Sequence, residues 1–120
     1  MSNLKESLEK LSAVDGFIGA CVVDANSGMM LGAHGGGPVN LEVAAAGNTE
    51  VVRSKLKTMK ALGLNDNIED ILITLGKQYH LIRPLAKREG LFVYLVLDKA
   101  KANLALGRHH LSSVEGEMTL

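Results

Sequence analysis

The sequence predicts an α+β fold, a five-stranded antiparallel sheet with one long helix on one face and two terminal helices on the other. The first observation behind this is the expected order of elements, helix, two strands, long helix, three strands, helix, with short hairpin-like turns between successive strands. The second is that residues 17–24 and 91–98 form strands whose alternating side chains are apolar on both faces. Helices are therefore needed on both sides of the sheet.

The N-terminal elements are expected to be a short helix and a hairpin. Residues 2–12 carry an apolar stripe of leucines, and Asn3 and Glu6 have the spacing of a capping box. Residues 17–24 follow as a strand that is apolar on both faces, which predicts a central position in the sheet. Turn residues then lead into a returning strand at residues 29–34.

The longest helix is expected at about residues 41–62, after the favourable N-cap Asn40. Its apolar positions recur every three or four residues and form a stripe broader than one sheet contact needs, so part of it is expected to face another molecule. Gly47 in the middle of this helix costs about 1 kcal/mol relative to Ala. Two explanations stay open: Gly47 lets a neighbouring molecule approach closely, or it clears space above the protein's own sheet.

Three strands and a helix complete the chain. Residues 68–75 alternate as a strand, and a tight turn leads into a second strand at residues 78–86. The strand at residues 91–98 is apolar except for its last residue, Asp98, which is expected to cap a helix at about residues 99–115.

Composition sets the broad class of the protein. At 120 residues the chain is expected to be one domain, residues 1–120. Thirteen basic and thirteen acidic residues balance, so there is no global charge favouring nucleic acid, and no apolar run is long enough to span a membrane. The single cysteine and the absence of a signal-like N-terminus favour the cytoplasm.

Three segments together resemble the Roadblock/dynein light chain family in its bacterial, stand-alone form. They are DANSG at residues 24–28, ILITLGKQYHLIRPL at residues 71–85, and LFVYLVLDKAKANLALG at residues 91–107. The resemblance covers nearly the whole chain. It implies a homodimer in which the third strand of each copy pairs across a two-fold axis and the long helices pack side by side.

The residues themselves are compatible with such a dimer. A strand at residues 68–75 at the edge of the sheet has no proline and only Glu69 and Asp70 near its start to discourage pairing, so an uncovered edge would promote aggregation. The expected interface residues lie on this strand and on the long helix: Ala44, Gly47, Val51, Val52, Leu56, Ile71 and Ile73.

The resemblance also implies a function without catalysis. Family members bind and regulate Ras-like small GTPases or serve as adaptors in motility and signalling complexes. Arg53, Lys57 and Lys60 share one side of the long helix and are candidates for contact with an acidic partner, although the same spacing also fits an ordinary solvated face. No Walker motif is present, so any effect on nucleotide hydrolysis would be exerted on the partner.

No set of residues indicates catalytic, metal or cofactor chemistry. Cys21 lies in an apolar strand and is expected to be buried, and the four histidines have no ligand spacing. Two alternatives to the adaptor remain: a purely structural subunit of a larger assembly, and a small-ligand sensor. For the sensor, the small residues Gly19, Ala20 and Gly32 would leave room for a pocket.

Overall fold

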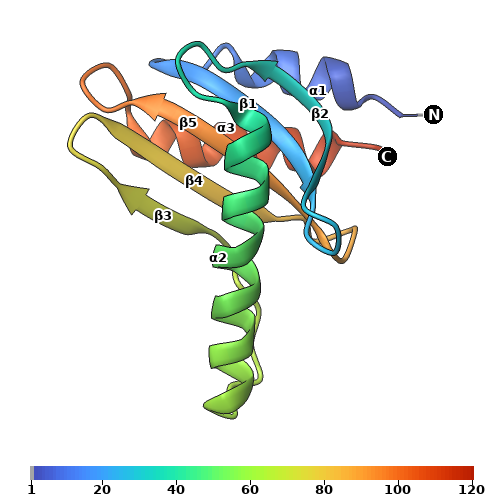
Figure 1. Ribbon diagram of the computed structural model, residues 1–120. Helices are drawn as coiled ribbons and strands as arrows, with labels where there is room; N and C mark the ends of the chain where they lie inside the picture. Colours follow the sequence, from blue (N-terminus) through green and yellow to red (C-terminus); the bar gives the residue numbers. More distant parts are fainter. Residues whose placement is uncertain (1) are drawn as a thin grey trace.

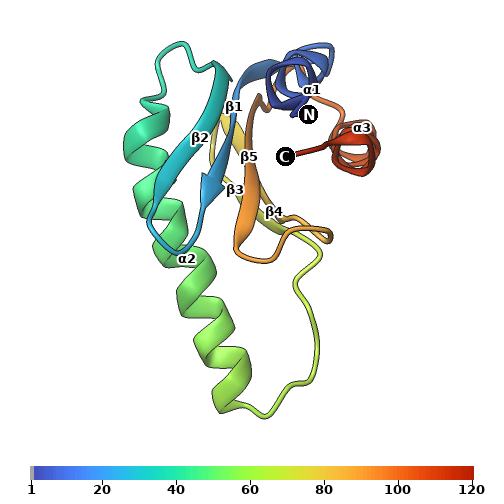
Figure 2. The same cartoon turned by 90° about the vertical axis from the view of Figure 1, so that its right-hand side faces the viewer.

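Three layers make up the computed structural model, which describes residues 2–120 (Figures 1 and 2). Helix α2 forms one outer layer, a five-stranded sheet the middle, and helices α1 and α3 the other outer layer. This confirms the predicted α+β fold and the assignment of the helices to the two faces. The elements are α1 (Leu4–Leu11), β1 (Phe17–Asp24), β2 (Met29–Gly35), α2 (Leu41–Ala61), β3 (Ile71–Thr74), β4 (Gln78–Pro84), β5 (Leu91–Asp98) and α3 (Leu104–Glu117).

The sheet has the order β2-β1-β5-β4-β3, and all neighbouring strands are antiparallel. The two strands predicted to be apolar on both faces, β1 and β5, lie side by side at its centre. The shorter strands β2 and β3 form its edges. β3 therefore occupies the edge position that the sequence predicted for it.

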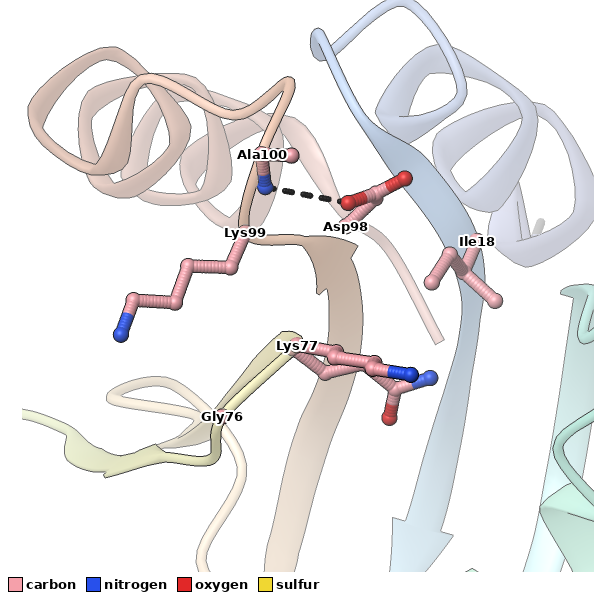
Figure 3. Close-up of a pocket in the computed structure, with 7 residues that line it drawn as sticks. Ile18, Gly76, Lys77, Asp98, Lys99 and Ala100 are labelled. Atoms are coloured by element: carbon pink, nitrogen blue, oxygen red, sulfur yellow. Dashed lines mark hydrogen bonds between the residues drawn. The ribbon is translucent and has the colours of Figure 1, made fainter.

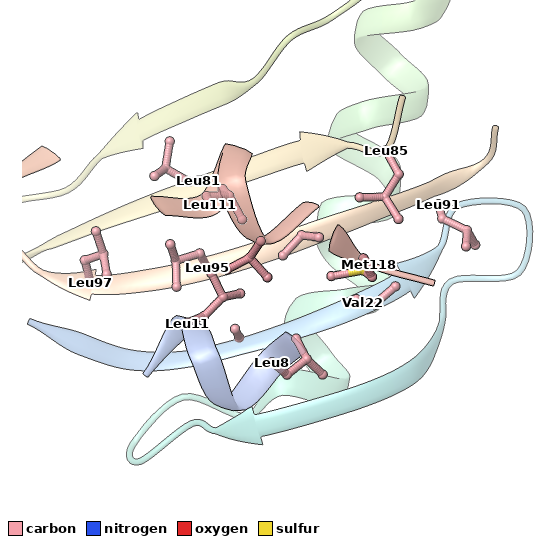
Figure 4. Close-up of a cluster of buried hydrophobic side chains, with 13 residues drawn as sticks. Leu8, Leu11, Val22, Leu81, Leu85, Leu91, Leu95, Leu97, Leu111 and Met118 are labelled. Atoms are coloured by element: carbon pink, nitrogen blue, oxygen red, sulfur yellow. The ribbon is translucent and has the colours of Figure 1, made fainter. Parts of the chain in front are cut away.

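Each face of the sheet has its own apolar core. The core under α1 and α3 is built mainly of leucines and includes Leu8, Leu95, Leu111 and Met118 (Figure 4). The core under α2 contains Cys21, Val52 and Tyr94 among others. Because side chains alternate along a strand, successive residues of β5 contribute to the two cores in turn.

Helix α2 is longer than the sheet that it covers. Its N-terminal half packs on β1 and β2, and its C-terminal half extends beyond the sheet before the chain returns to β3 (Figures 1 and 2). From residue 53 to residue 61 every side chain except that of Met59 is exposed. Asn40 caps the helix as predicted, since its Oδ1 accepts a hydrogen bond from the Val43 N–H at 3.1 Å.

The prediction that Asp98 caps the last helix is wrong. α3 begins at Leu104, and its cap is Asn103, whose Oδ1 accepts from the Leu106 N–H at 3.1 Å. The Asp98 carboxylate instead accepts from the Ala100 N–H at 3.0 Å, which stabilises a turn between β5 and α3. This turn packs against Gly16, where a Cβ would lie 2.8 Å from the Asp98 carbonyl oxygen. The contact with Gly16 therefore helps to set the turn at residues 98–102, which local capping preferences had assigned to the helix.

The predicted capping box of the first helix is also absent. The Asn3 side chain makes no cap of α1; its Nδ2 donates to the Glu117 carbonyl at 2.8 Å, and its Oδ1 accepts from the Thr119 N–H at 2.7 Å. Asn3 thus ties the N-terminal helix to the C-terminal segment.

Four strand boundaries differ from the prediction, and the smallest difference is that β3 ends at Thr74 instead of residue 75. β4 ends at Pro84 instead of residue 86, and proline lacks the N–H that a continued ladder needs. β3 begins at Ile71 instead of residue 68, because Asp70 is held by Arg108 of α3 through two hydrogen bonds of 3.1 Å. β2 continues one residue beyond its predicted end, to Gly35.

Candidate protein-interaction surface

The outer edge of β3 is the first feature of the candidate surface. β3 pairs only with β4 within residues 2–120, so its other edge has free backbone groups. Its side chains Ile71 and Ile73 are half-buried, on the sheet face that α2 covers elsewhere. Leu75, just past the strand, is 43% exposed. The edge thus combines unsatisfied backbone hydrogen-bonding groups with apolar side chains, which is the combination that favours strand pairing.

The flank of α2 nearest β3 is the second feature. Val51 of α2 and Ile71 of β3 both pack at the margin of the core beneath α2. Along this flank run five small residues at spacings of three and four positions: Ala44, Gly47, Val51, Ser54 and Thr58. A groove of about 470 Å³ lies over the second part of this row. Small side chains at such spacing let a second helix approach closely.

The surroundings of Gly47 exclude one of the two explanations that the sequence left open. A Cβ built at this position would meet no atom within 4 Å. Gly47 is therefore not needed to clear space above the protein's own sheet. The open position agrees with the other explanation, the close approach of a neighbouring molecule.

A polar cluster lies on the same sheet face, between the two features. The Nδ1 of His80 in β4 lies 2.9 Å from the Tyr94 hydroxyl of β5, and its Nε2 lies 2.8 Å from Oε1 of Gln78. Because an amide oxygen only accepts, Nε2 carries the ring proton and Nδ1 accepts from Tyr94. Burial lowers the pKa of His80, so the ring is neutral at neutral pH. Burial raises the pKa of Tyr94, partly offset by a hydrogen bond with the Asn48 side chain of α2.

The predicted interface residues do not all lie on this surface. Ala44, Val51, Ile71 and Ile73 are half-buried at its margin, and Gly47 is exposed on it. Leu56 is 48% exposed on the projecting half of α2. Val52, in contrast, is 4% exposed and belongs to the protomer's own core. Sequence spacing grouped Val51 with Val52, although a step of one residue turns the side chain by about 100° around the helix.

The three basic candidates lie on the opposite flank of α2. Ala46 lies next to Gly28 in the β1–β2 turn, and Arg53 and Lys60 follow it at intervals of seven residues on the same side. Arg53, Lys57 and Lys60 are all exposed. The contact of Arg53 with Glu50 is long, at 3.9 Å, and exposed, so it contributes little. The basic flank is thus accessible and separate from the small-residue flank.

The cysteine and histidines that were considered for catalysis or metal binding do not come together in one site. Cys21 has no exposed surface, and burial raises the pKa of its thiol to about 12. His110 is engaged with the Lys10 carbonyl at 2.9 Å, and His109 is exposed. Among residues 2–120, no group of three or more His, Cys, Asp or Glu side chains is arranged to hold a metal ion. No helix in the same range is long and apolar enough to cross a membrane.

The room that the small residues were expected to leave for a ligand is filled. A Cβ at Gly19 would lie 2.6 Å from the Gly36 backbone, and one at Gly32 would lie 2.9 Å from the Leu4 side chain of α1. Ala20 has no exposed surface. These residues allow close packing of the chain on itself, so the sequence basis for a ligand sensor is wrong.

A shallow hollow of about 590 Å³ lies elsewhere, between the β3–β4 turn and the segment after β5 (Figure 3). Lys77 and Lys99 border it, and the Asp98 carboxylate is already bonded to the Ala100 N–H. The hollow has no converging acid, base and nucleophile, and it offers no basis for catalysis.

Comparisons with known proteins agree with this architecture. No protein-family model and no curated protein matches the chain. MglB from Myxococcus xanthus superposes with a TM-score of 0.82 over 95% of this chain and 89% of its own, at 16% identity. A Roadblock/LC7 domain from Streptomyces avermitilis gives 0.83 over 97% and 94%, at 13% identity. The chain has the Roadblock/LC7 fold. The gliding protein MglB from Thermus thermophilus shares it, with a TM-score of 0.73 over 95% of this chain and 89% of its own at 18% identity.

Two contributors to the candidate surface were missed from the sequence. Arg108 holds Asp70 and so fixes where β3 begins, but these residues are 38 positions apart and nothing local links them. Leu75 was assigned to the strand and not to the interface. Its place after two alternating isoleucines was a signal for the same apolar face.

Proposed function

We propose that this protein is a non-catalytic homodimeric adaptor that binds a Ras-like small GTPase and changes its nucleotide cycle. The proposal rests on one observation: the free, apolar edge of β3 and the open flank of α2 with its small residues lie on the same side of the molecule. A second copy of the chain would cover both features at once. Such a contact buries the half-exposed isoleucines and supplies the missing backbone partners.

The fold neighbours support the choice of an adaptor. They include the MglB proteins, one described as a gliding protein and one in a tetrameric arrangement, and MglC from Myxococcus xanthus. Within residues 2–120 no group of His, Cys, Asp or Glu side chains is arranged to hold a metal ion, and the buried Cys21 thiol is no nucleophile, which favours the same role. A Ras-like GTPase is the partner that the Roadblock resemblance implies.

The basic flank of α2 is the part of the surface we assign to this partner. If α2 pairs through Val51, then Arg53, Lys57 and Lys60 remain exposed on the other side of the helix. They project beyond the sheet, where a third protein reaches them without displacing the second copy. Their positive charge suits an acidic patch on that protein and raises its rate of association.

Two measurements test the proposal. Sedimentation of the purified chain is expected to show a dimer at micromolar concentration, and a monomer would overturn the homodimer. The chain is then mixed with a purified Ras-like GTPase, and a changed rate of hydrolysis or nucleotide exchange is expected. Unchanged rates, together with no binding, would overturn the regulatory role.

Charge reversal tests the assigned flank. The combined change Arg53→Glu, Lys57→Glu and Lys60→Glu is expected to abolish the effect on the GTPase and leave the dimer intact. Lys5→Glu on α1, at an exposed site on the opposite face, serves as the control and is expected to change neither. If the triple variant acts like the parent, the GTPase binds elsewhere.

A further inference from the structure

Part of the sheet face on which α2 lies has no helix over it. α2 packs on β1 and β2, whereas β4 and β3 continue beyond them to the free edge. Four side chains of this open area are half-buried: Ile71, Ile73, Gln78 and His80. The area lies between the free edge of β3 and the small-residue flank of α2. Any molecule that covers both of these features therefore also covers His80.

His80 uses both of its ring nitrogens in the neutral form. Its Nε2–H donates to Oε1 of Gln78 at 2.8 Å, and its Nδ1 accepts from the Tyr94 hydroxyl at 2.9 Å. The Asn48 amide of α2 donates to the Tyr94 oxygen, because this hydrogen bond lowers the pKa of Tyr94. The hydrogen bonds thus run in one direction, from α2 through β5 to β4. A second ring proton, on Nδ1, would meet the hydroxyl proton of Tyr94 head-on.

The strands beside His80 provide no negative charge for a protonated ring. Across the sheet His80 lies opposite Ile73 of β3 and Val96 of β5, which are both apolar. The titratable groups on this side are Tyr94 and, opposite it on β1, Cys21. Burial raises the pKa of both, so both are neutral at physiological pH.

Charged side chains border the open area. Glu50 and Lys55 line the groove on the small-residue flank of α2, and Lys77 lies in the turn between β3 and β4. All three are exposed, and β3 itself has no charged residue. Burial is the cause that lowers the pKa of His80, so these charges do not determine it.

Solvent decides whether His80 can hold a second proton. In the isolated protomer, water reaches the half-buried ring and can hydrate an imidazolium once the Tyr94 hydroxyl turns away. Beneath a second copy that water is excluded, and burying an unpaired charge costs far more free energy than burying a neutral ring. The ring must therefore release its Nδ1 proton to the solvent when the face is covered.

We propose that this open face is a pH-gated interface, which a second copy of the chain covers while His80 is neutral and leaves when His80 gains a proton. This gate rests on the proposed homodimer and adds the proton as its regulator. Each copy has one such ring, so the formation of a dimer from fully protonated copies releases two protons. The gate requires only that the face be covered, whatever the arrangement of the β3 edges.

Sedimentation at a series of pH values tests the gate, between about pH 8 and about pH 5 where histidine titrates. The dissociation constant of the dimer is expected to rise as the pH falls below the ordinary histidine value of 6.5. The rise is at most about tenfold per pH unit for each copy. Circular dichroism at each pH shows whether the released copies remain folded.

Two histidine variants assign the effect. His80→Gln cannot gain the proton, so its dimer is expected to have a dissociation constant that changes much less with pH. His109→Gln on α3, at an exposed site, is the matched control and is expected to keep the parental pH dependence. If His80→Gln keeps the parental dependence as well, another group is responsible and the gate is overturned.

A titration of the His80 ring by NMR gives a second readout in the unaltered chain. Its pKa is expected to be lower in the concentrated dimer than in the dilute monomer, because the dimer selects the neutral ring. Tyr94→Phe removes the hydrogen bond that Nδ1 accepts and so favours protonation. The dimer of this variant is expected to dissociate at a higher pH than that of the parent.

The contrary results are distinguishable. A dimer with the same dissociation constant at every pH, or with the His80 pKa of the monomer, would overturn the gate and leave the homodimer intact. Dissociation that occurs only together with unfolding would assign the pH effect to the protomer and also overturn the gate. A chain that is monomeric at every pH would overturn the homodimer itself.

Discussion

Replacing Gly47 is expected to change the stability of the protomer and the affinity of the dimer in opposite directions. Gly47 lies inside the 21-residue helix α2, and a Cβ there would meet no atom within 4 Å. Glycine in a helix interior costs about 1 kcal/mol relative to Ala. Gly47→Ala is therefore expected to raise the free energy of unfolding of the protomer by about 1 kcal/mol, and Gly47→Leu by slightly less.

The larger replacement is expected to act in the opposite direction on the dimer. A leucine at position 47 fills the space where a second helix would approach, and overpacking of this kind costs about 1–3 kcal/mol at each site. Two-fold symmetry introduces the change twice, so the dissociation constant is expected to rise by at least about tenfold. Sedimentation over a range of concentrations measures association, and urea unfolding of the dilute monomer measures stability.

Gly116 provides a matched control. It also lies in a helix, and a Cβ added there would meet no atom within 4 Å, but it belongs to α3 at the other face of the sheet. Gly116→Leu is expected to leave association unchanged. If Gly47→Leu dimerises as tightly as the parent, the flank of α2 lies outside the interface. If Gly47→Ala destabilises the dilute monomer, the open space inferred around Gly47 is incorrect.

Three further expectations concern the protomer. Arg83→Met is expected to lower the free energy of unfolding in urea by about 3 kcal/mol, because the Glu115 carboxylate, which is 10% exposed, loses a charged partner 2.5 Å away. If the double variant Arg83→Met, Glu115→Met loses as much stability as the sum of the two single variants, the two residues are not coupled. Because burial raises the pKa of Cys21 to about 12, native protein is expected to resist alkylation at mildly alkaline pH until it unfolds, and rapid labelling of native protein would argue against that burial. Burial lowers the pKa of His80, so the folded state binds fewer protons than the unfolded state. The free energy of unfolding is therefore expected to fall as the pH drops below the ordinary histidine value of 6.5. His80→Gln should make the free energy of unfolding less dependent on pH in this range, whereas His109→Gln at an exposed site should not.

Most of the fold could be predicted because its signals are local and periodic. Strands that are apolar on both faces require cover on both sides, and this alone indicated the three layers. The cap Asn40 and the length of α2 followed from residues within one helical turn of each end. The same local reasoning failed at Asn3, whose side chain bonds to the C-terminal segment, and at Asp98, whose carboxylate stabilises a turn before α3 instead of capping the helix.

The candidate surface could be predicted only in part. Ile71, Ile73 and Gly47 could be named as candidates because alternation along a strand and an unusual residue in a helix are visible in the sequence, and the structure places them on the edge strand and on the open side of α2. Val52 was misplaced, because periodicity identifies an apolar stripe but not which side of it the protomer's own sheet covers. That assignment depends on the crossing of α2 over β1 and β2, which is a long-range contact.

The sequence by itself determined the order of the elements, their types and the need for helices on both faces, because side-chain periodicity of two or 3.6 residues is a property of neighbouring positions. Only the tertiary structure decided that β3 is free along one edge and that the basic and small-residue flanks of α2 are separate. These features arise where segments far apart in the chain meet, as Arg108 meets Asp70 and α2 meets β1. Pairing of that kind depends on the whole folded chain, and no window of neighbouring residues contains it.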